Sequence, residues 1–125
     1  MYYKMRAMLT IDSRQTDTKR NRESLQKELY RVLSFFQPYA ILTDDKNAQF
    51  HFYYPDEEAE MRAAPSIALS VELHRECASF REVVLLAQIV QTTATWLDAP
   101  CGYSYRCQIL APYLVAKNGD IYTLP

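Results

Sequence analysis

The segment from Val83 to Leu97 contains only apolar residues, threonine and glutamine, although 23% of the chain is charged. At about 100° per residue of an α-helix, one set of side chains in this segment forms a continuous apolar face. That set is Val83, Leu86, Ala87, Val90, Ala94 and Leu97. A second apolar set, formed by Leu85, Ile89 and Trp96, falls on a flank about 120° away. Because a helix on a sheet needs only one apolar face, the second set predicts a further contact with another element or another chain.

Residues on either side of this segment carry helix start and stop signals. Ser79 and Glu82 have the spacing of a capping box, in which each side chain accepts a hydrogen bond from a free backbone N–H. Pro100 and Gly102 are typical of the region just beyond a helix end. We therefore expect a helix between Ser79 and Pro100.

An earlier helix is indicated by apolar residues that recur at helical spacing. These are Leu25, Leu29, Val32, Leu33 and Phe36. Asp17 or Thr18 is a suitable N-cap, and Pro38 is expected to end the helix.

Polar and apolar residues alternate elsewhere with the period of a half-buried strand, most clearly over 3–11 and 67–73. Shorter strands are expected at 39–43, 48–54, 103–110, 113–116 and 121–124. Residues 44–47 form a polar connection of hairpin length, and Asn118-Gly119 favours a type I′ hairpin turn. Residues 55–65 are expected to be the longest loop.

The predicted element order is β-α-βββ-α-βββ, without an internal repeat or a linker. This order favours an α+β fold, a two-layer sandwich of a mostly antiparallel sheet with two helices on one face, ferredoxin-like in outline. A chain of 125 residues has the size of one domain, so we expect a single domain over 1–125.

Charge and hydropathy argue against several classes of protein. The net charge of −1 and pI near 6.1 provide no overall attraction for nucleic acid or for an anionic membrane. The chain starts without the apolar stretch of an export signal, and segment 83–97 is too short to span a bilayer. Three cysteines are an odd number, which favours reduced thiols. We expect a cytoplasmic protein with no membrane partner.

Metal binding and catalysis have weak support in the sequence. Cys77, Cys101, Cys107 and His74 are the residue types of a zinc site, but Cys101 and Cys107 lack the close spacing of paired zinc ligands. We expect no metal and no cofactor. His74 lies two positions from Glu72 on one side of a strand, so a small enzyme that uses this pair is one alternative function. A surface histidine beside a carboxylate is the simpler interpretation, and we expect the chain not to be an enzyme.

A second alternative is binding of RNA or single-stranded nucleic acid through an aromatic sheet face. Segment 46–53 interleaves aromatic and polar residues, in partial likeness to the base-stacking strand of an RNA-recognition motif. The glycines of that motif are missing, and Phe50 and Phe52 equally fit a core-facing pattern. Binding by this route would use Phe50 and Tyr53.

The favoured hypothesis is a small non-enzymatic module that binds a protein partner and acts by covering its surface, as an inhibitor, immunity-type or regulatory protein. Nine of the ten tyrosines fall in or beside predicted strands, which supports a binding surface. We also expect the chain to associate with a second copy of itself as a homodimer. The partner-binding residues are predicted to be Leu85, Ile89, Trp96, Tyr53 and Tyr105 as anchors, with Asp56, Glu57, Glu58 and Glu60 as rim charges.

Overall fold

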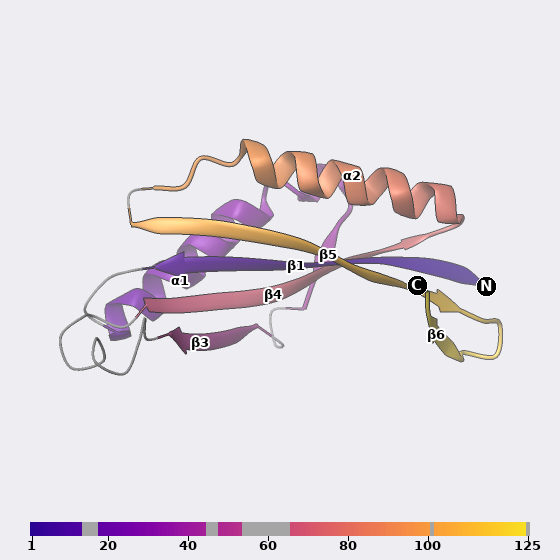
Figure 1. Ribbon diagram of the computed structural model, residues 1–125, viewed down its shortest axis with the longest axis horizontal. Helices are drawn as coiled ribbons and strands as arrows, with labels where there is room; N and C mark the ends of the chain where they lie inside the picture. Colours follow the sequence, from indigo (N-terminus) through magenta and orange to yellow (C-terminus); the bar gives the residue numbers. More distant parts are fainter. Residues whose placement is uncertain (14–17, 45–47, 54–65, 101, 125) are drawn as a thin grey trace.

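The computed structural model describes residues 1–13, 18–44, 48–53, 66–100 and 102–124, which form an α+β fold (Figure 1). The predicted fold class is confirmed at this level, since two helices accompany an open antiparallel sheet of six strands. The elements are β1 (Tyr2–Ser13), α1 (Thr18–Leu33), a 3-10 helix η1 (Gln37–Tyr39), β2 (Leu42–Thr43), β3 (Gln49–Tyr53), β4 (Ser66–Cys77), α2 (Phe80–Trp96), β5 (Tyr103–Val115) and β6 (Ile121–Thr123).

The first strand of the chain is the central strand of the sheet. β1 pairs with β4 on one side and with β5 on the other, giving the order β2-β4-β1-β5-β6. β3 also pairs with β4. Every pairing between described strands is antiparallel.

The hairpin predicted around residues 44–47 does not form between the described strands. β3 pairs with the beginning of β4, from Ser66 to Ser70, whereas β2 pairs with Leu73 and His74 farther along. β4 is twelve residues long, so its outer edge accommodates two short strands in succession. The backbone groups of β2 and β3 are satisfied by β4, not by one another.

The strands predicted at 103–110 and 113–116 are one continuous strand, β5. Its register on β1 shifts between Arg6, which pairs with Leu110, and Lys4, which pairs with Tyr113. β5 therefore carries one extra residue there, as in a β-bulge, and this is where Pro112 is tolerated without interrupting the strand.

The predicted hairpin between β5 and β6 is confirmed, but its turn differs from the type I′ turn. Gly119 has φ +89°, whereas Asn118 does not have the positive φ that a type I′ turn requires. The Gly119 N–H donates to the Ala116 carbonyl at 2.9 Å, and the Ala116 N–H donates to the Asp120 carbonyl at 2.9 Å. Asn118 Oδ1 accepts from the Asp120 N–H, so the asparagine stabilises the turn through its side chain.

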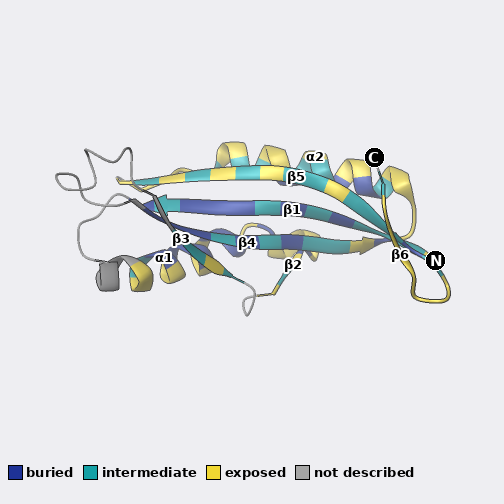
Figure 2. Cartoon of the chain, turned by 60° about the horizontal axis from the view of Figure 1, so that its bottom comes forward, coloured by how far each residue is buried: buried dark blue, intermediate teal, exposed yellow. Residues whose placement is uncertain are grey.

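Both helices lie on one face of the sheet, behind the strands in Figure 2. α1 packs on β4 and β1, and α2 packs on β1 and β5. Alternate residues of β1 are completely buried beneath them, as the period-two pattern predicts. The core combines Met5, Ala7, Leu9 and Ile11 of β1 with Leu25, Leu29 and Val32 of α1 and Val83, Leu86 and Val90 of α2.

Both side chains of the predicted capping box cap α2, although Glu82 accepts from the residue before the N-cap instead of from Ser79 itself. Ser79 Oγ accepts from the Glu82 N–H at 3.2 Å, and Glu82 Oε2 accepts from the Ala78 N–H at 2.9 Å. α1 ends at Leu33, earlier than predicted, and Pro38 lies within η1 instead. In the part of the chain that the structure describes, no helix is both long and apolar enough to cross a membrane.

Candidate functional site

An exposed, largely apolar groove lies between α2 and the end of α1 with η1. We call it the interhelix surface, formed by Phe35, Tyr39, Leu85, Ile89, Thr92, Thr93 and Trp96. It contains two hollows of about 510 and 310 Å³ that share Tyr39, Thr92 and Thr93, so the groove continues along α2.

The second apolar flank predicted for α2 lies on this groove, but its three residues differ in burial. Trp96 is 80% exposed and Leu85 is 50% exposed. Ile89 is half-buried and packs against the core. The flank is therefore only partly covered within a single chain, and Phe35 and Tyr39 extend the exposed apolar area onto the neighbouring elements.

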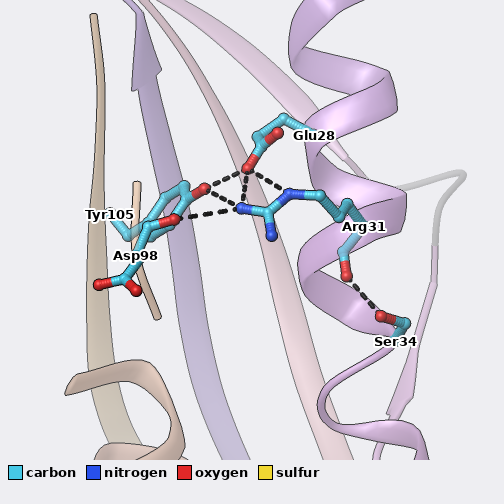
Figure 3. A network of polar contacts seen from close by, with 5 residues as sticks. All are labelled: Glu28, Arg31, Ser34, Asp98 and Tyr105. Atoms are coloured by element: carbon cyan, nitrogen blue, oxygen red, sulfur yellow. Dashed lines mark hydrogen bonds and ion pairs between the residues drawn. The ribbon is translucent and has the colours of Figure 1, made fainter. Parts of the chain in front are cut away.

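A polar network holds one end of the groove together (Figure 3). Arg31 donates to Glu28 Oε1 from Nε at 3.0 Å and from Nη2 at 2.6 Å. Arg31 Nη2 also donates to the Tyr105 hydroxyl at 2.8 Å and to the Asp98 carbonyl at 3.3 Å. The Tyr105 hydroxyl in turn donates to Glu28. These bonds connect α1, β5 and the segment after α2.

The ionisation of the network follows from these contacts. Burial raises the pKa of Glu28, but the hydrogen bonds from Arg31 and Tyr105 outweigh it and leave this pKa lowered. The hydrogen bond to Glu28 raises the pKa of Arg31. Burial and the hydrogen bond to Glu28 raise the pKa of Tyr105 to about 12. The nearly buried carboxylate is thus ionised and balanced by a guanidinium, which keeps the shape of the groove without adding net charge.

Tyr105 was predicted to contact a partner, and the structure places it in this network on the helix side of the sheet, packed against the core. Sequence reasoning missed Glu28 and Arg31. Their signal was a glutamate among the apolar positions of the first helix, with an arginine three residues later.

The other predicted partner-binding residues lie outside the described part of the chain. They are the side chain of Tyr53 and residues Asp56, Glu57, Glu58 and Glu60. Their role stays a prediction.

The opposite face of the sheet carries polar pairs between neighbouring strands. Arg6 Nε donates to Glu72 Oε1 at 2.6 Å, and its guanidinium carbon lies 3.9 Å from the centre of the Tyr113 ring. Arg106 Nε lies 3.2 Å from Asp12 Oδ2 and forms an ion pair with it. Because these groups satisfy one another across strands, this face is typical of a solvated sheet surface.

The histidine and glutamate considered for catalysis also lie on this face. Burial, together with Lys4, lowers the pKa of His74, and Glu72 is ion-paired with Arg6. A hollow of about 500 Å³ is lined by His51 and Glu72, with Met8, Gln49 and Ser70. The sequence did not indicate that His51, not His74, shares a hollow with Glu72.

The aromatic residue expected to stack on nucleic acid faces the core. Phe50 pairs with the buried Leu69 and packs against the core beneath the helices. The Arg22 guanidinium lies over its ring at 5.4 Å. Phe50 therefore lies on the helix side of the sheet and not on the opposite face, where base stacking would take place.

Cys77 and Cys107 lie too far apart to share the zinc site considered from the sequence. Cys77 pairs with Tyr3 of β1 and Cys107 pairs with Leu9, so roughly 20 Å of strand separates the two. Burial raises the pKa of both thiols. Cys101 lies outside the described residues, and among those that are described no three His, Cys, Asp or Glu side chains gather as a metal site.

The interhelix surface is thus a largely apolar groove with two charged lining residues at one end, Asp98 and Arg31, the second of which is paired with Glu28. Such a groove offers apolar contact area with a few polar groups. Comparison with known proteins found no matching family model, no matching curated protein and no matching solved structure.

Proposed function

We propose that this chain is a small non-enzymatic module that binds a protein partner through the interhelix surface and inhibits or regulates it by covering part of its surface. The observation that carries the proposal is the exposure of Trp96, at 80%, beside a groove of about 510 Å³. Covering an exposed tryptophan removes roughly 150–250 Å² from water, worth about 4–6 kcal/mol before the costs of association. Tryptophans of this kind are typical anchors of protein interfaces.

The shape of the groove favours a helix as the occupant. The exposed or half-buried residues Leu85, Ile89, Thr92 and Trp96 follow one another along α2 at helical spacing. They span about 16 Å, which matches about three turns of a partner helix. The uncharged lining of α2 favours an apolar helix face with anchors at positions i, i+4 and i+7.

We also infer that the fold is a variant of the ferredoxin-like plan. The order β5-β1-β4, followed by the short strands β2 and β3 at one edge, supports this, with the strand after α1 divided in two. Many unrelated functions share that plan, so the proposal for function depends on the groove alone.

The test is comparative capture of partners from a lysate of the source organism. We expect a protein that binds the immobilised wild-type chain and is lost with Trp96→Ala and with Leu85→Asp. Tyr122→Ala is the matched control, because Tyr122 is 53% exposed on β6, away from the groove. The proposal would be contradicted if the wild type and the control captured only proteins that Trp96→Ala also captures.

A further inference from the structure

Among the described residues, no strand pairs with the outer edge of β5 over most of its length. β6 pairs only with Tyr113, Leu114 and Val115, and the Leu124 N–H donates to the Pro112 carbonyl at 2.9 Å. Residues 103–111 have no strand on that side among the described residues, and Figure 2 shows β5 as the border of the sheet there. Natural edges are usually short or protected by several charges, whereas this one carries Arg106 as its single charged residue.

We propose that this edge pairs in antiparallel fashion with the same edge of a second copy, forming a twofold-symmetric dimer with one continuous sheet. Because pairing with β6 begins at Pro112, the open stretch is centred on Cys107. With a twofold axis at Cys107, all of residues 103–111 pair with the same residues of the second copy. This pairing ends before the segment of β5 that pairs with β6. An isologous interface of this kind is the commonest form of a homodimer.

The residues that this register brings together are compatible. Tyr105 lies opposite Ile109 of the second copy, an aromatic and β-branched pair of the kind that stabilises antiparallel strands. Arg106 lies opposite Gln108 of the second copy, so the two arginines are not opposed. The edge is therefore complementary to itself.

The helix layer also accommodates a second copy. α2 packs mainly on β1 and β5 and also touches β4, so its axis lies over β1 or between β1 and β5. The proposed twofold axis is then about one to one and a half strand spacings away, and the two copies of α2 lie roughly 10–14 Å apart. The lower end of this range is the upper end of the usual distance between packed helices. The flank of α2 on that side is uncharged: Gln91, Ala94 and Thr95 line a hollow of about 380 Å³ with Tyr105 and Cys107.

The edge of β5 and the neighbouring flank of α2 together favour a second copy over an unrelated extended peptide. A peptide strand would pair with the edge of β5 but leave the flank of α2 uncovered. A second copy brings its own β5 edge and its own α2 flank to the same interface. The interhelix surface lies on the opposite flank of α2 and remains available to another partner. The proposed dimer is thus independent of the proposed function.

Charge substitutions at Gln108 test the dimer and its register. Gln108 is exposed, so these changes leave the core intact. We expect sedimentation equilibrium to show a dimer for the wild type, with a Kd raised roughly fivefold to tenfold by Gln108→Arg and lowered by Gln108→Glu. The first variant opposes two arginines at each of two symmetric positions, and the second forms an ion pair at each. The double variant Arg106→Glu/Gln108→Arg should restore dimerisation to at least the wild-type level.

Trp96→Ala is the control for association through the other flank of α2, and we expect it to leave the Kd unchanged. Circular dichroism and thermal unfolding establish that each variant is folded. A wild-type monomer throughout the concentration range would overturn the proposal, as would a dimer that responds to Trp96→Ala but not to the charge at position 108.

Discussion

At the scale of single residues, Glu28, Arg31 and Tyr105 show how a nearly buried charge is retained in a small fold. The carboxylate accepts three hydrogen bonds, two from the guanidinium and one from the phenol. Burial alone would favour its neutral form, and these donors reverse that preference. The network also connects the elements that border the groove.

We expect Tyr105→Phe to lower the free energy of unfolding by about 1–2 kcal/mol, because the change removes the hydroxyl that bridges Arg31 and Glu28. Urea denaturation followed by circular dichroism measures this effect. Tyr122→Phe is the matched control at an exposed site, and a difference of a few tenths of a kcal/mol is expected there. Equal effects of the two substitutions would contradict a structural role for the network.

The lowered pKa of Glu28 also predicts a pH dependence. A carboxyl group whose folded-state pKa lies below its ordinary value of 4.5 contributes stability that is fully present above that pH. The contribution is lost as the pH falls through the folded-state pKa. We therefore expect Glu28→Gln to destabilise the protein at pH 7 and to differ less from the wild type at pH 3. A pH-independent difference in unfolding free energy would refute the assignment.

At the scale of elements, α2 has a different environment on each of its sides. One side packs on the sheet, one borders the groove beside α1, and one lies beside the open edge of β5. From Val83 to Trp96 none of these sides carries a charge, which allows this part of the helix to serve both as core and as contact surface. Its stability therefore depends on the core-facing residues and on its cap, not on every apolar residue it carries.

Ile89 and Leu85 separate these roles on one flank. We expect Ile89→Ala to lower the free energy of unfolding by about 2 kcal/mol, because its side chain packs against the core. Leu85→Ala, at a residue that is 50% exposed, should cost no more than about 0.5 kcal/mol. Chemical denaturation of the two variants measures both values, and the reverse order would be inconsistent with the burial described here.

At the scale of the whole molecule, the two proposed contact surfaces lie on opposite flanks of one helix. Self-association through β5 would leave Trp96 in water, whereas binding of a partner in the interhelix surface would cover it. Since Trp96 is the only tryptophan of the chain, its fluorescence distinguishes the two events.

We expect acrylamide to quench the fluorescence of Trp96 as efficiently as that of an exposed indole, because the side chain is 80% exposed. Raising the protein concentration through the range of dimerisation should not change the quenching constant. The Gln108→Arg variant should give the same acrylamide quenching constant as the wild type at every protein concentration. Protection of Trp96 that increases with dimerisation would instead assign self-association to the interhelix surface.

Patterns between near neighbours in the chain determined much of this fold. The alternation in β1 and β4, the helical spacing in α1 and α2, the capping box at Ser79 and the β5–β6 hairpin all follow from contacts within a few residues. The exposed flank of α2 was predictable for the same reason, because helix geometry alone separates Trp96 from the core face.

Only the tertiary structure decided which edges pair and where polar groups meet. β2 and β3 both pair with β4 instead of with each other. β5 continues through Pro112 as one strand. The hydroxyl of Tyr105 forms hydrogen bonds with Glu28 and Arg31. Each of these depends on groups far apart in sequence, so no local pattern specifies them. The sequence by itself determined the local elements and their faces. Pairing among backbone and side-chain groups that are distant in sequence determined their arrangement, because backbone polar groups removed from water need partners in the fold.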